Sequence, residues 1–242
     1  MPSIFLFPRQ HSRHQHRQHG PPASKLSFIL QPKSHPSGII RVLNNFVKNN
    51  FHFKVLVVSG VNLITFNTGY GIGLTSPLLG QLTGLYLDED NFSWFASSLV
   101  IGQIIGSLIG STIANRLGRK KTCMMAALFS SCGWAMLAAS QNFWMLILAR
   151  ITTGMFDCLA IPGGYMYISE VSETKLKGSF LNSNAIASGL GIAFGYLFGS
   201  NFLWRYTCFV ALLVNASGIM TFLLCQESPV FLLMKNQVNI EH

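Results

Sequence analysis

Charged residues are scarce in this chain, and acidic ones are the scarcest. Only 10% of its 242 residues are charged and 50% are hydrophobic, whereas soluble domains carry about 25% charged residues. No Asp or Glu precedes Asp88, and the net charge is +9. The bases lie in the N-terminal segment and in short loops instead of alternating with aromatic residues on a polar face. This distribution argues against a nucleic-acid partner and favours an integral membrane protein.

The sequence also lacks the motifs of metal centres and of catalysis. Its five cysteines form no CxxC pair and no Cys/His cluster with metal spacing, which argues against a zinc site or a disulfide framework. No GxSxG, HExxH or phosphate-binding loop occurs, and no GxGxxG precedes a strand pattern. We therefore expect neither an enzyme nor a bound metal or cofactor.

Residues 1–50 differ in composition from the rest of the chain. The stretch 9–20 is rich in His, Arg and Gln and cannot bury enough apolar area to offset the entropy of ordering. We expect a disordered, basic cytoplasmic tail; loose metal binding by its four histidines and a transit peptide are the alternatives. Residues 51–235 form the expected membrane domain, and residues 236–242 form a short C-terminal tail.

Six apolar segments follow, each long enough to cross a hydrocarbon core of about 30 Å as a helix. They run approximately over Val55–Pro77, Trp94–Ala114, Thr122–Ser140, Phe143–Ile168, Phe180–Phe202 and Tyr206–Cys225. The turn at residues 115–121 carries four of the seventeen Lys and Arg residues. Because such bases stay on the cytoplasmic side, both chain ends are predicted to be cytoplasmic. The glycosylation sequon at Asn91 falls in the loop predicted to lie outside, and its closeness to the second segment argues against glycosylation.

Glycines recur every fourth residue in two of these segments. This spacing places them on one helix face, where helix backbones can approach closely. The glycines concerned are Gly102, Gly106, Gly110, Gly191, Gly195 and Gly199.

Two charged residues lie inside the fourth segment, where charges are rare and are functional candidates. Arg150 and Asp157 are seven residues apart, which is about 10 Å along one helix face. We therefore expect each to pair with another helix or to line a wet cavity. For Asp157, a proton-coupling role and a structural partnership with a polar group on another helix both remain open.

Three motifs in a fixed order resemble a known family, the major facilitator transporters. Residues 111–121 resemble the loop between helices two and three of that family, and residues 227–232 resemble the box after helix six of its sugar porter branch. Residues 75–77 and 93–94 are similar to the insect trehalose and facilitated-hexose members. Three further segments resemble the helix four-to-five signature of the branch, namely Arg150-x3-Gly154, Tyr167-x2-Glu170 and Lys177-Gly178.

The resemblance implies an all-α integral membrane fold. Its six transmembrane helices would form the N-terminal half of a twelve-helix transporter, as a 3+3 inverted repeat. In that family, charge pairs at the cytoplasmic helix ends lock the two halves when the cavity faces outward. The gate and its signature would comprise Asn115, Arg116, Gly118, Arg119, Lys120, Arg150, Glu170, Lys177, Gly178 and Glu227. The substrate cavity would include Ser188, Ile192 and Asp157.

Departures from the family pattern affect the expected function. Ala185 stands where the sugar-binding Gln of helix five falls, and Ala cannot hydrogen-bond a hydroxyl. The first segment holds no carboxylate, although proton-coupled relatives carry an Asp there. We expect facilitated diffusion of a sugar, trehalose or a hexose, by alternating access at the plasma membrane. The alternatives are a non-transporting interaction or regulatory protein, and assembly with a second half-transporter or as a homodimer.

Overall fold

The computed structural model describes residues 51–83, 91–228 and 231. An all-helical fold is confirmed for these residues, whereas the expectations for residues 1–50 and 236–242 fall outside them. The described part contains seven helices: α3 (Phe51–Gly73), α4 (Thr75–Leu82), α5 (Phe92–Leu117), α6 (Arg119–Ala138), α7 (Phe143–Val171), α8 (Thr174–Asn201) and α9 (Trp204–Leu224).

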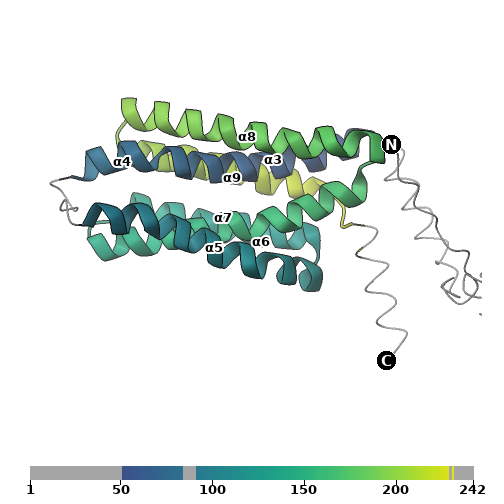
Figure 1. Cartoon of the computed structure of the whole chain (residues 1–242), viewed down its shortest axis with the longest axis horizontal. Helices are drawn as coiled ribbons and strands as arrows, with labels where there is room; N and C mark the ends of the chain where they lie inside the picture. The colour runs from purple at the N-terminus through teal and green to yellow at the C-terminus, as the bar shows by residue number, and fades with distance from the viewer. Residues whose placement is uncertain (1–50, 84–90, 229–230, 232–242) are drawn as a thin grey trace, which may run out of the picture. The chain divides into compact units, whose positions relative to one another are not determined.

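The first apolar segment forms two helices, α3 and α4, which meet at Leu74. Pro77 has no N–H to donate to the carbonyl of Gly73, so the helical hydrogen-bond ladder is interrupted there. Leu74 keeps helical backbone angles, and its N–H donates to the carbonyl of Tyr70 at 2.9 Å. α4 therefore continues in the direction of α3 (Figure 1) and ends at Leu82 instead of Pro77.

Four helices, α3, α5, α7 and α9, are long and apolar enough to cross a membrane. α6 and α8 occupy the places of two further expected spans, with 20 and 28 residues, but the apolar criterion is met by only four helices of the described part. The reason is polar sequence in both helices. α6 opens with Arg119, Lys120 and Lys121, whereas α8 is rich in Gly, Ser and Asn along its length.

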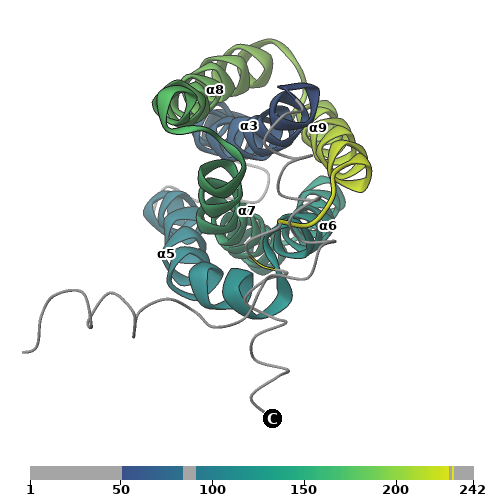
Figure 2. The same ribbon diagram turned by 90° about the vertical axis from the view of Figure 1, so that its right-hand side faces the viewer.

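The long helices lie side by side and reverse direction at each connection (Figure 1). Seen end-on, α7 lies between α3 on one side and α5 and α6 on the other (Figure 2), and it packs against all three. α8 packs on α3, while α9 packs on α3 and α6. The side chains of α7 therefore meet several different helices. Glu170 and Asp157, which take part in the contacts described below, both belong to α7.

The interface of α5 with α7 is a direct backbone contact. A Cβ atom on Gly102, Gly106 or Gly110 would lie 2.2, 1.9 or 2.6 Å from a carbonyl oxygen of α7. Gly154 of α7 faces α5 in return, with its Cβ position 2.3 Å from the carbonyl oxygen of Leu99. The predicted role of the glycine spacing is thus confirmed here.

The interface of α3 with α8 is built in the same way. Cβ atoms on Gly191 and Gly195 of α8 would lie 2.2 and 2.4 Å from carbonyl oxygens of α3. From the other side, Cβ atoms on Gly69 and Gly73 would lie 2.2 and 2.1 Å from the carbonyl oxygens of Ser188 and Ile192. No larger residue fits at these positions without moving the helices apart.

Candidate functional site

The charged side chains gather where α5 meets α6 and where α7 meets α8. We call this region the charged end. The turn between α5 and α6 is a single residue, Gly118, whose φ of 102° suits glycine and strains other residues. The members of the charged end are Lys54, Arg119, Lys120, Glu170, Glu173 and Glu227.

An ion pair at the charged end joins α6 to α7. Nη2 and Nε of Arg119 donate to Oε1 of Glu170, at 2.9 and 3.1 Å. The other carboxylate oxygen of Glu170 accepts from the hydroxyl of Ser228. Only 4% of the Arg119 side chain and 14% of the Glu170 side chain are exposed, and the guanidinium lies over the ring of Phe231. The pair is therefore largely shielded from water, where attraction between charges is stronger than in bulk.

A second set of contacts joins the start of α6 to the end of α9. Oε1 of Glu227 accepts from the backbone N–H of Lys120 at 3.0 Å, one of the donors that a helix start leaves unpaired. Nζ of Lys120 donates to the carbonyl oxygens of Cys225 at 2.6 Å and Leu223 at 3.4 Å. A negative group thus lies at a helix N-terminus and a positive group at a helix C-terminus, and both placements suit the helix dipoles. A Cβ on Gly118 would lie 2.9 Å from Glu227.

Another ion pair was not predicted from the sequence. Nζ of Lys54, near the start of α3, lies 2.7 Å from Oε1 of Glu173, which precedes α8. The side chain of Lys54 is 4% exposed and that of Glu173 is 47% exposed. A contact of α7 with the segment after α9 is also present, in which the hydroxyl of Tyr167 donates to the carbonyl of Gln226. The signal for the ion pair was present in the sequence, because a lone base and an acid border apolar segments at the same predicted membrane face.

The remaining predicted gate residues do not join these contacts. Asn115 and Arg116 are exposed on the last turn of α5. Within the ranges that the structure describes, neither Arg116 nor Lys177 forms an ion pair. A Cβ on Gly178 would meet nothing within 4 Å.

Arg150 lies far from the charged end. It precedes Glu170 by twenty residues on α7, which is about 30 Å along the helix. Its side chain is fully buried, donates to the carbonyl of Gly71 at 3.1 Å and to the hydroxyl of Thr75, and lies 5.0 Å from the centre of the Phe95 ring. Arg150 therefore connects α7 to the junction of α3 and α4.

The three predicted cavity residues lie in different surroundings. Asp157 is 3% exposed and accepts hydrogen bonds from Ser130 of α6 at 2.5 Å and Asn67 of α3 at 3.5 Å. It therefore has the interhelical partners that a structural role requires. Ser188 is half-buried and Ile192 is 40% exposed, both on α8.

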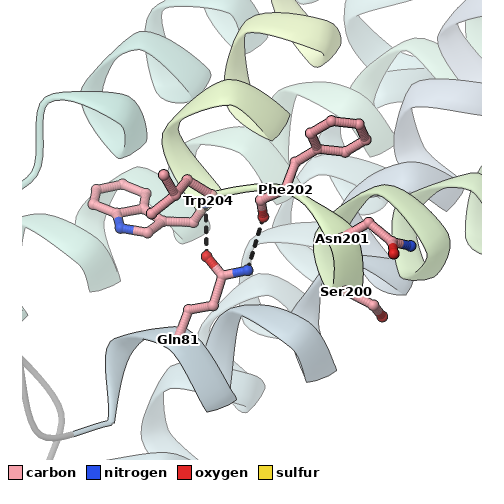
Figure 3. A pocket seen from close by; sticks show the side chains of 6 residues that line it. Gln81, Ser200, Asn201, Phe202 and Trp204 are labelled. Atoms are coloured by element: carbon pink, nitrogen blue, oxygen red, sulfur yellow. Dashed lines mark hydrogen bonds between the residues drawn. The ribbon is translucent and has the colours of Figure 1, made fainter.

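A polar contact at the opposite end was also missed by the sequence reasoning. Nε2 of Gln81 donates to the carbonyl oxygen of Phe202 at 2.9 Å, and Oε1 accepts from the N–H of Trp204 at 2.7 Å (Figure 3). The same Nε2 also donates to the carbonyl oxygen of Gly199 at 2.7 Å. One side chain thus forms hydrogen bonds with backbone groups that lack helical partners at the end of α8 and the start of α9. A single Gln in an apolar stretch was the available signal. A pocket of about 230 Å³ here is lined by Gln81, Ser200, Asn201, Phe202, Leu203 and Trp204.

Comparison with solved structures shows which fold this arrangement belongs to. The chain superimposes on the crystal structure of a D-xylose–proton symporter with a TM-score of 0.64 and 21% identity, over 79% of this chain and 52% of that one. The human organic anion transporter MFSD10 gives a TM-score of 0.60 at 17% identity, over 72% of this chain and 48% of that one. The shared feature is the major facilitator fold.

Comparison of sequences identifies the family. Facilitated glucose transporter member 8 of Bos taurus is 29% identical over 174 residues, and member 6 of Mus musculus is 31% identical over 182 residues. These alignments cover 70% and 71% of this chain but 36% of each relative, so the chain spans about a third of their length. The model of the family "Sugar (and other) transporter" matches residues 44–241. The chain therefore belongs to the sugar transporter family of the major facilitator superfamily.

Proposed function

We propose that this chain serves facilitated diffusion of a sugar, trehalose or a hexose, across a membrane by alternating access. The observation that carries the proposal is the charged end, in a chain of the sugar transporter family. There, Arg119 and Glu170 link neighbouring helices through side chains that are largely buried but still partly exposed to water. Opposite charges in such a partly dry interface can separate and rejoin at modest net cost.

The charged end is proposed to face the cytoplasm, with all six long helices spanning the bilayer. Support comes from the position of the bases, since Lys and Arg of short loops stay on that side. A membrane-impermeant maleimide applied to intact cells should label a Gln141→Cys variant, in the turn between α6 and α7. It should leave a Lys175→Cys variant unlabelled, and labelling of that variant from outside would contradict the orientation.

The six helices are further proposed to form two inverted repeats of three. Support comes from the glycine interfaces, because exchanging the first three helices with the last three converts the α5–α7 contact into the α8–α3 contact. Both contacts are built from glycine faces that meet carbonyl oxygens. Such repeats place the substrate near the membrane midplane.

A second candidate function is supported by Ala185. Its side chain is exposed on α8, at the position that the resemblance assigns to sugar binding, and it offers no hydrogen bond to a hydroxyl. A site without this group loses affinity for a polyol. The second candidate is a membrane protein that binds or regulates a partner transporter without transporting sugar itself.

Uptake of labelled trehalose and glucose into oocytes that express the chain separates the two candidates. The proposal predicts saturable uptake at neutral pH that a proton uncoupler leaves unchanged. An Ala185→Gln variant should take up more sugar, because it restores a hydrogen-bonding group. Ala187→Gln serves as the control, since this residue lies two positions further along and on the other side of the helix. Absence of uptake by both the parent chain and Ala185→Gln, with surface expression verified, would contradict transport and favour the second candidate.

A further inference from the structure

A buried polar cluster connects four helices in the interior of the bundle. Asn215 of α9 donates to the hydroxyl of Ser130 on α6 at 3.2 Å, and that hydroxyl donates to Oδ1 of Asp157 on α7 at 2.5 Å. Asn67 of α3 donates to the same oxygen at 3.5 Å. Asn67 and Ser130 thus donate directly to one carboxylate, and Asn215 is linked to it through Ser130. We call these four residues the Asp157 cluster.

The Asp157 cluster is almost completely withdrawn from solvent. The exposed fractions are 3% for Asp157, 2% for Asn215, and 0% for Asn67 and Ser130. A carboxylate in such a place is stable only when it is paired with a positive charge or neutralised.

No basic side chain of the described residues forms an ion pair with Asp157. Lys54 of α3 and Arg119 of α6 lie at the charged end and pair with other acids, and Arg205 begins α9 beside Trp204. Arg150, two turns away on α7, donates to Gly71 and Thr75 instead. The described residues therefore supply no positive charge to this carboxylate.

The cluster also holds oxygen atoms that lack a donor. Oδ1 of Asn67 and Oδ1 of Asn215 are both buried without a hydrogen-bond partner. Turning the Asn67 amide around would not help, because its oxygen would then face the carboxylate oxygen. Unpaired buried oxygens are costly, and here both belong to side chains whose amide groups donate to Asp157 or to its partner Ser130. Oxygen atoms and negative charge are the environment that protons and hard metal cations prefer.

We propose that the Asp157 cluster binds a single monovalent cation, a proton or a sodium ion, which neutralises the carboxylate between α3, α6, α7 and α9. A proton would reside on the carboxyl group and donate toward an unpaired oxygen. A sodium ion would be held by the carboxylate, the Ser130 hydroxyl and the two amide oxygens. In either form the cation stabilises the contact of four helices (Figure 2). The proposal is independent of sugar transport, because its tests use the protein without sugar.

Infrared spectroscopy of the purified chain in lipid nanodiscs tests the proton. At neutral pH the chain should show the carbonyl stretch of a buried, protonated carboxylic acid, and Asp157→Asn should lack this band. Ser130→Ala should move the band, because it removes the hydrogen bond to the carboxyl group. Ser131→Ala should leave it in place, since that hydroxyl donates to Ala127 on its own helix.

Thermal unfolding tests sodium. At pH 8 and constant ionic strength, replacing choline with sodium should raise the melting temperature of the parent chain and leave that of Asp157→Asn unchanged, because only the folded site binds the ion. An acid band identifies the bound cation as a proton, and a sodium response without the band identifies sodium. If the band is absent and both chains respond equally to sodium, the proposal is overturned.

Discussion

The middle of the helix bundle and its charged end are held together by different kinds of contact. In the middle, α5 and α7 meet through their backbones, and a Cβ on Gly106 would lie 1.9 Å from the carbonyl oxygen of Met155. At the charged end, α6 and α7 meet through Arg119 and Glu170, whose ion pair is 2.9 Å long. A side-chain pair can open by rotation about its bonds, whereas a backbone contact opens only if whole helices separate. This difference supports the proposal that the contact in the middle is permanent and the one at the charged end is exchangeable.

The largest effect on stability is expected when only one partner of the Arg119–Glu170 ion pair is removed. Arg119→Ala leaves Glu170 shielded and without its cation, and should lower the free energy of unfolding by about 3 kcal/mol, the lower part of the range for buried pairs. Glu170 is not completely buried, with 14% of its side chain exposed. Adding Glu170→Gln should restore part of the loss. Chemical unfolding in detergent measures both variants, and equal stability of the single and double variants would contradict a paired charge.

Removing both partners of this ion pair should open the charged end. Cys225 is 3% exposed there, and its carbonyl accepts from Lys120. In a variant with both Arg119→Ala and Glu170→Ala, Cys225 should react faster with a maleimide, as measured by mass spectrometry. Unchanged labelling of Cys225 would count against the gate.

A smaller effect is expected from the middle of the bundle. Gly106→Ala forces a methyl group against the backbone of α7 and should destabilise the protein by about 2 kcal/mol, as overpacking does elsewhere. Gly189→Ala is the matched control, because nothing lies within 4 Å of its Cβ position. That variant should be more stable by about 0.5 kcal/mol, the usual gain when Ala replaces Gly within a helix. Thermal unfolding compares the two, and equal effects would argue against backbone contact.

The smallest effect is expected from the ion pair of Lys54 with Glu173. Since 47% of the Glu173 side chain is exposed, water screens the pair, and Lys54→Met should cost about 0.5 kcal/mol. The loss should shrink further as salt is added. Lys121→Met, at an exposed position of α6, controls for removal of a positive charge. A loss for Lys54→Met as large as that for Arg119→Ala would show that exposure does not distinguish the two ion pairs.

Much of the fold could be predicted from the sequence, because apolar length and glycine spacing are local signals. The glycine faces of α5 and α8 followed from a four-residue spacing alone. Helix ends were less accurate: α7 continues to Val171 and α8 begins at Thr174, since a helix extends past the point where its residues become polar.

The partners of the polar side chains could not be predicted, because they lie on different helices. Arg119 and Glu170 were assigned to one region by resemblance, but Arg150 was placed with them although it meets Gly71. The contact of Asp157 with Ser130 depends on how α6 is rotated about its axis, which no local pattern specifies. Asn67 and Asn215 lie within apolar segments, and their sequence neighbours do not show that the two side chains donate to Asp157 and Ser130.

Hydrogen–deuterium exchange of the chain in lipid nanodiscs distinguishes a permanent contact in the middle of the bundle from an exchangeable one at the charged end. Amide exchange reports local opening of each segment. Arg119→Ala should accelerate exchange at residues 118–123 and 225–228 and leave residues 102–110 and 151–159 protected. Gly106→Ala should show the reverse pattern. If either substitution loosens both regions equally, the bundle opens as one unit and the distinction between its middle and its charged end is wrong.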